Sequence, residues 1–161
     1  MADLKVTLQE SITLPNGNKE SLYNTTTIPG VNQVLRRTDT IVTSFSGSGI
    51  EILKFVNSES EQTAGSFVKS DVKYLRITNL DSTNYGLIYL IDTNQESVIF
   101  KLEAGKSLMF GDVEFDTPGN SDYVVEGAWD PTYYSSFVYF DTVKAKAVSS
   151  SIQLEYFVAS A

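Results

Sequence analysis

Apolar and polar residues alternate with a period of two along much of this chain. Near the N-terminus the apolar residues fall at even positions with polar residues between them, at Leu4, Val6, Leu8, Ile12 and Leu14. Successive side chains of a strand point to opposite faces, so this pattern predicts a half-buried β-strand.

The sequence Pro-Asn-Gly-Asn at residues 15–18 predicts that this first strand turns back on itself. Asn-Gly is a strong hairpin signal because both residues tolerate positive φ angles. We expect the return strand over residues 20–28, after which Pro29-Gly30 interrupts the pattern.

The rest of the chain repeats this kind of pattern, and little of it has a helical period. One short helical turn is expected near residues 63–69. Short strands separated by Asn, Asp and Gly predict an all-β fold: a two-sheet antiparallel β-sandwich, jelly-roll-like, with little helix. The further strands are expected over residues 34–45, 50–56, 72–80, 85–91, 98–102, 107–110, 123–126, 137–140, 143–148 and 152–158.

The length of 161 residues fits one domain, and neither a linker nor an internal repeat divides it. We therefore expect a single β-sandwich domain over residues 1–161. Strands at both ends suggest that the termini are woven into the sheets. The same strands could act as interface arms that add to a neighbour's sheet by edge pairing.

The charge balance narrows the choice of partner. Twelve Lys and Arg residues against 20 Asp and Glu residues give a net charge of −8. Nucleic acid and an anionic membrane surface are both disfavoured by this charge. The chain has no cysteine and shows no signal peptide, which predicts synthesis in the cytoplasm.

The absence of histidine argues against most catalytic chemistry. Histidine is the usual general base and a common metal ligand, so we expect no catalytic residue, no cofactor and no enzyme activity. Paired carboxylates could still hydrolyse glycosides, which leaves a hydrolase as the least favoured hypothesis. The candidate carboxylates are Glu51, Glu103, Asp112, Glu114, Asp116, Glu126 and Asp141.

Asp112, Glu114 and Asp116 form the sharpest acidic cluster. At strand spacing they project from one face, where like charges repel unless a cation such as calcium compensates them. The simpler interpretation, which we favour, is a solvated face whose inner side carries Val113 and Phe115.

Two further groups are candidates for contact with a partner. Trp129, Tyr133 and Tyr134 lie around an Asp-Pro turn and could stack on a glycan or on a protein, or could cover one end of the sandwich. Arg36 and Arg37 are adjacent, so on a strand they point to opposite faces, and we expect one of them to form an ion pair.

Four segments between about residues 47 and 116 stand out: Gly65-Ser66-Phe67-Val68, the run from Val72 to Asp81, Asn84-Tyr85 and the run from Leu102 to Ser107. Through these segments the chain resembles small virion structural proteins of marine tailed bacteriophages.

The resemblance implies a capsid decoration or cement protein located in the virion. Its partners would be the major capsid protein and further copies of itself, with threefold positions on a shell favouring a homotrimer. The alternative is a tail or fibre-associated module that binds host surface glycans through Trp129, Tyr133 and Tyr134.

Overall fold

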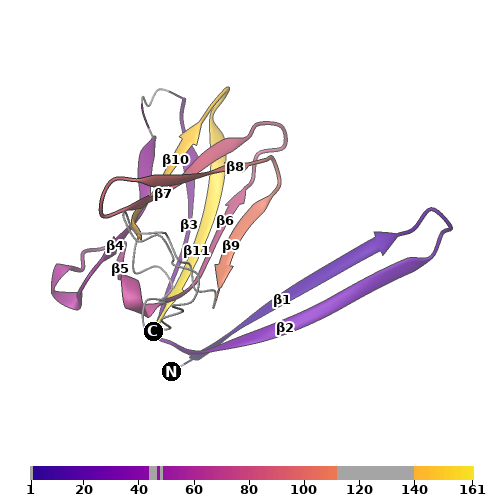
Figure 1. Cartoon of the computed structure of the whole chain (residues 1–161), viewed down its shortest axis with the longest axis horizontal. Coiled ribbons are helices and arrows are strands. Elements are labelled where there is room, and N and C mark those ends of the chain that lie inside the picture. Colours follow the sequence, from indigo (N-terminus) through magenta and orange to yellow (C-terminus); the bar gives the residue numbers. More distant parts are fainter. Residues whose placement is uncertain (1, 44–46, 48, 112–139) are drawn as a thin grey trace, which may run out of the picture.

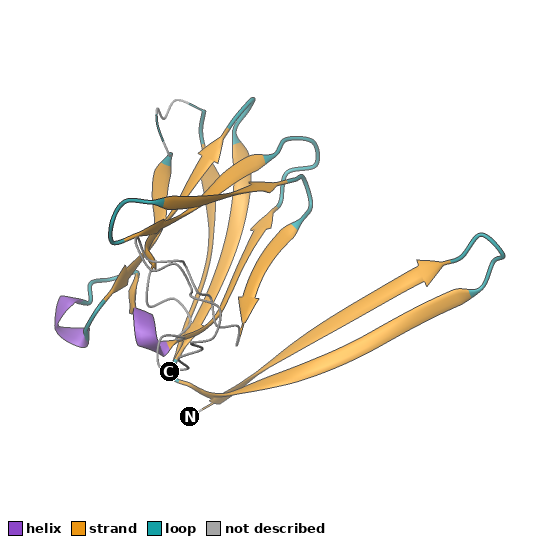
Figure 2. Cartoon of the chain, in the orientation of Figure 1, coloured by secondary structure: helices purple, strands orange, loops and turns teal. Residues whose placement is uncertain are grey.

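The computed structural model describes residues 2–43, 47, 49–111 and 140–161. In these residues the regular structure consists of β-strands with two short 3₁₀ turns. Two sheets pack face to face as a sandwich, and a separate β-ribbon extends away from it (Figures 1 and 2). The predicted all-β sandwich with little helix is confirmed.

Within the described part of the chain, one sandwich sheet has five strands in the order β5-β4-β10-β7-β8 and the other has four in the order β3-β11-β6-β9. The five-stranded sheet comprises β4 (Ile50–Val56), β5 (Ser66–Val68), β7 (Gly86–Asp92), β8 (Ser97–Leu102) and β10 (Phe140–Ala147). The four-stranded sheet comprises β3 (Gln33–Ile41), β6 (Val72–Asn79), β9 (Ser107–Gly111) and β11 (Ile152–Ser160).

The core lies between the two sheets and is built from the inward side of each alternating strand. In β11 the even positions Ile152, Leu154, Tyr156 and Val158 are all fully buried, as the period-two pattern predicts. The facing sheet contributes buried residues such as Val143 of β10. Burial of apolar surface on this scale is the main favourable contribution to folding.

Asn79 ties two loops together at one end of the sandwich. Its buried side chain donates hydrogen bonds to the carbonyl oxygens of Asn84 and Leu102, at 2.8 and 3.2 Å. Its side-chain oxygen accepts a hydrogen bond from the backbone N–H of Asp81, at 3.0 Å. Buried polar groups must be satisfied in this way, so Asn79 fixes the loops that follow β6 and β8.

Two details differ from the sequence prediction. The helical turn expected over residues 63–69 is wrong, because residues 66–68 form β5; the 3₁₀ turns lie instead at Glu59–Glu61 and Lys69–Asp71. β5 also pairs with β4 in a parallel sense, whereas the other described strand pairs are antiparallel. The strand orders do not establish a jelly roll, which stays a prediction.

The first two strands lie outside the sandwich. β1 (Ala2–Thr13) and β2 (Lys19–Val31) pair with each other over their whole length and form a two-stranded sheet of their own. This ribbon, which we call the arm, runs away from the sandwich and ends in the turn at residues 14–18 (Figure 1). The N-terminal strand is therefore not woven into the sandwich, while the C-terminal strand β11 is.

Candidate functional site

The turn at the far end of the arm forms where the Pro-Asn-Gly-Asn sequence predicts it. Leu14 accepts a hydrogen bond from the N–H of Gly17 at 2.8 Å and donates its own N–H to the oxygen of Asn18 at 2.8 Å. Gly17 has a φ of 84°, a conformation that glycine adopts without a steric penalty. Asn16 caps the turn by accepting the N–H of Asn18 at 3.0 Å.

Residues that face each other across the arm point to the same face, so the register defines two faces. Glu10 pairs with Leu22, and Ile12 pairs with Glu20. One face, which we call the apolar face, carries the even residues of β1 and their partners. The opposite face is polar apart from Tyr23, which pairs with Gln9.

The base of the arm is held against the outer side of the four-stranded sheet. Ile28 and Val31 are about 5 % and 4 % exposed and pack with Tyr74 and Ala159 in a small apolar cluster of their own. The pairing of β1 with β2 shifts register between Ala2 and Leu4, opposite Pro29 and Gly30, and Gly30 has a φ of 77°. This bulge marks the place where the chain leaves the arm and enters β3.

Beyond its base the apolar face of the arm is open to solvent. Leu8, Ile12 and Leu22 are 44 %, 57 % and 60 % exposed. They form one zigzag stripe, because Leu22 lies diagonally across the ribbon from both Leu8 and Ile12. The pattern predicts a half-buried strand, yet the structure buries the apolar face at the base and leaves it uncovered along the rest of the arm.

The outer face of the four-stranded sheet contains a cleft beside the arm. On this outer face, four residues that are paired across neighbouring strands form a row of side chains: Arg36, Phe157, Arg76 and Met109. This row, with Tyr74, forms one wall of the cleft, and β1 forms the other through residues 4–7. Met109 is 48 % exposed at the edge of this wall.

Glu155 lies between the two arginines of this face. Arg36 donates two hydrogen bonds to one oxygen of Glu155, at 2.9 and 2.6 Å, and Arg76 donates one to the other oxygen at 2.7 Å. The hydrogen bonds from Arg36 and the charges of both arginines hold the pKa of Glu155 below its ordinary value, against the opposing effect of burial. One carboxylate thus serves two guanidinium groups, and the Nε atom of Arg76 is buried without a hydrogen-bond partner.

The structure places Arg36 and Arg37 on opposite faces of β3, as their adjacency predicts. The expected single ion pair becomes two, because Arg37 contacts Asp39 at 3.0 Å while Arg36 contacts Glu155. Asp39 also accepts a hydrogen bond from the buried Tyr156 hydroxyl, whose pKa is raised by burial and by this bond. The two arginines therefore belong to separate clusters, and Arg36 lines the cleft.

Sequence reasoning did not single out Glu155, Arg76 or Met109. The sequence does contain a signal for Glu155: it shares its side of the strand with the apolar residues Phe157 and Ala159. A carboxylate that is carried into such a strand is normally paired, so it predicts a cationic partner on a neighbouring strand. Which strand supplies that partner depends on the sheet order, which the pattern does not reveal.

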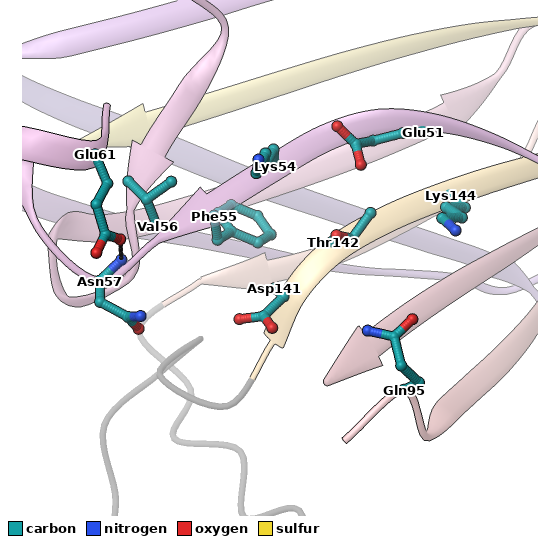
Figure 3. A pocket seen from close by; sticks show the side chains of 10 residues that line it. All are labelled: Glu51, Lys54, Phe55, Val56, Asn57, Glu61, Gln95, Asp141, Thr142 and Lys144. Carbon is teal, nitrogen blue, oxygen red and sulfur yellow. Dashed lines mark hydrogen bonds between the residues drawn. The ribbon is translucent and has the colours of Figure 1, made fainter. Parts of the chain in front are cut away.

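A second hollow lies over β4 and β10 on the outer side of the five-stranded sheet (Figure 3). Its walls are mostly polar and carry charges of both signs, including Glu51, Lys54 and Lys144. Asp141 at its edge is already paired with the buried Lys69. A mixed, open surface of this kind lacks the apolar walls that enclose most small-molecule ligands.

Seven of the candidate residues chosen from the sequence fall outside the described residues. They are the calcium candidates Asp112, Glu114 and Asp116, the candidate carboxylate Glu126, and the aromatic candidates Trp129, Tyr133 and Tyr134. Across residues 2–43, 47, 49–111 and 140–161, no group of three or more potential metal ligands occurs. These same ranges hold no helix with the length and apolar character needed to cross a bilayer.

The comparisons with known proteins add no family. No protein-family model matches the chain, and neither a curated protein nor a solved structure matches it significantly.

Proposed function

We propose that the protein is a non-enzymatic structural subunit of a bacteriophage virion, acting as a capsid decoration or cement protein. It would stabilise the head through contacts with the major capsid protein and with further copies of itself. The observation that carries this proposal is the arm, because it extends away from the sandwich and its apolar face is exposed to solvent.

The arm favours a role in assembly for an energetic reason. A two-stranded ribbon is at best marginally stable in water, because it has no second layer on which to bury its apolar side chains. Leu8, Ile12 and Leu22 would gain stability from any surface that covers them. Extended arms of this kind are useful to a subunit that must hold neighbours together.

The composition supports the same role. A net charge of −8 keeps subunits apart and soluble at high concentration before assembly. The chain also lacks the histidine and cysteine side chains on which most catalysis relies. The resemblance of residues 47–116 to small virion proteins adds the phage context.

Purified particles of the phage that encodes the chain test the proposal. Quantitative mass spectrometry should find the chain at a copy number near that of the major capsid protein, and electron cryomicroscopy should place it on the outer surface of the head. Particles from which it has been stripped should release their DNA at a lower temperature, and adding the wild-type protein back should reverse the change. A few copies confined to the tail, or none in the particle, would contradict the proposal.

A further inference from the structure

We propose that the outer half of the arm binds the arginine-lined cleft of a second copy of this chain. The inference rests on the proposed structural role, because it identifies one partner that the arm would take in the assembly. Two surfaces of the same chain support the inference. The exposed apolar face of the arm is the donor surface, which inserts into the neighbour, and the cleft beside the arm is the acceptor surface, which receives the neighbour's arm.

The donor surface combines apolar and acidic side chains on one face. Glu10 lies opposite Leu22, and Glu20 lies opposite Ile12, so both carboxylates share the face of the apolar stripe. All four side chains are on exposed segments of the arm. This face therefore presents an apolar centre with two negative charges beside it.

The acceptor surface has the complementary composition. Met109 and Phe157 supply apolar surface, and Arg36, Arg76 and Lys5 supply cations around them. The guanidinium of Arg76 lies 5.9 Å from the centre of the Phe157 ring, which places its charge directly against the apolar part of the cleft.

The positive charge of the cleft is not fully compensated. Glu155 is shared by Arg36 and Arg76, so one carboxylate faces two guanidinium groups. Arg36 keeps a 69 % exposed side chain, from which further carboxylates can accept hydrogen bonds. In a chain with a net charge of −8, this local excess of positive charge attracts carboxylates such as Glu10 and Glu20.

The outer half of the arm cannot reach the cleft of its own chain. Residues 4–7 already form the wall of that cleft, and the ribbon then continues away from the sandwich (Figure 1). At ~3.4 Å per residue, the stretch from Thr7 to Thr13 extends about 20 Å beyond the wall. The donor face is therefore carried to where a neighbouring copy would stand, and each copy offers both one donor and one acceptor surface.

Mutual exchange of two arms would give a closed dimer. Passing each arm to the next copy would give a ring if the rotation between copies closes, and an open filament if it does not. All of these forms join the same two surfaces, so the inference concerns the contact itself. Sedimentation velocity over a wide range of protein concentration measures the assembly and its dissociation constant. The wild-type protein should self-associate.

Neighbouring residues on opposite faces of the arm provide a matched pair of variants. Leu22→Ser removes an apolar side chain from the donor face and should raise the dissociation constant about thirtyfold. Tyr23→Ser removes a larger and more exposed side chain from the opposite face, and should change it by less than about twofold. Circular dichroism and thermal unfolding would confirm that the sandwich is intact in both.

Charge reversal tests the acceptor. Glu10→Lys with Glu20→Lys should weaken association by about tenfold, and Arg36→Glu should weaken it similarly, because each change sets like charges against each other. Combining all three substitutions in one chain restores opposite charges, so association should return toward the wild-type value. Recovery of this kind is not expected from three independent losses of folding.

Three outcomes would overturn the inference: a wild-type protein that stays monomeric throughout, association that is indifferent to Leu22→Ser, or a triple variant that is no better than the charge-reversed parents. The particle experiment is separate. Copies on the head with a monomer in solution would refute the arm exchange and leave the virion role standing. If the protein associates through its arm but is absent from particles, the arm exchange stands and the virion role is refuted.

Discussion

Truncation of Ile28 to alanine should loosen the arm from the sandwich without unfolding the sandwich. Ile28 is about 5 % exposed and packs with Tyr74 and Ala159 at the base of the arm, in a cluster separate from the main core. Losing its outer carbon atoms costs about 0.8 kcal/mol per methylene-sized group, or about 2.4 kcal/mol in total. The equilibrium between the docked and undocked arm should then shift about fiftyfold toward undocking.

Hydrogen exchange measured by mass spectrometry would detect this shift. Peptides from the base of β1 and β2 should exchange faster by up to that factor, while peptides from β6 and β11 should keep their protection. Tyr23→Ala is the control, because Tyr23 lies on the opposite face of the arm and is 69 % exposed. An equal loss of protection in β6 and β11 would show that arm and sandwich form one cooperative unit, and would refute the reasoning.

Three further substitutions test the sandwich by urea unfolding. Asn79→Leu should lower the free energy of unfolding by about 3 kcal/mol, because it removes the side-chain partners of the buried carbonyl of Leu102 and of two half-buried backbone groups; a loss below about 1 kcal/mol would contradict this. Asp141→Asn should cost about 3 kcal/mol, since it leaves the buried ammonium of Lys69 without its carboxylate; an unchanged midpoint would argue against that pair. For Glu155, whose pKa is lowered by the fold, the wild-type protein should lose stability as pH falls below the ordinary value near 4.5, and Glu155→Gln should flatten this decline.

Much of the fold follows from the two-residue alternation of the sequence. Where one side of a strand faces the core, as in β11, the pattern states which side chains are buried, and the structure confirms it. The hairpin turn at residues 14–18 was also predictable, because Pro-Asn-Gly-Asn has few other uses. Residues 66–68 were harder to assign, since a strand of three residues is too short to display a period.

The arm and its cleft were less accessible to this reasoning. The apolar positions of β1 predict that something covers them, but alternation carries no information about which surface does so. The cleft is built from β3, β6, β9 and β11, which are distant in sequence, so its arginines converge only once the sheet order is known. Arg36 was singled out from the sequence, while its partner Glu155 lies 119 residues further along the chain.

The position of the two last-made strands sets the order in which this chain can fold during synthesis. β10 sits between β4 and β7, and β11 sits between β3 and β6, so the five-stranded sheet lacks an inner strand until residue 147 has left the ribosome and the four-stranded sheet until residue 160 has done so. The arm, by contrast, closes within the first 31 residues, and short loops close fastest. A nascent chain can therefore pair β1 with β2 early, but the base of the ribbon docks only when β11 supplies Ala159 at the end of synthesis.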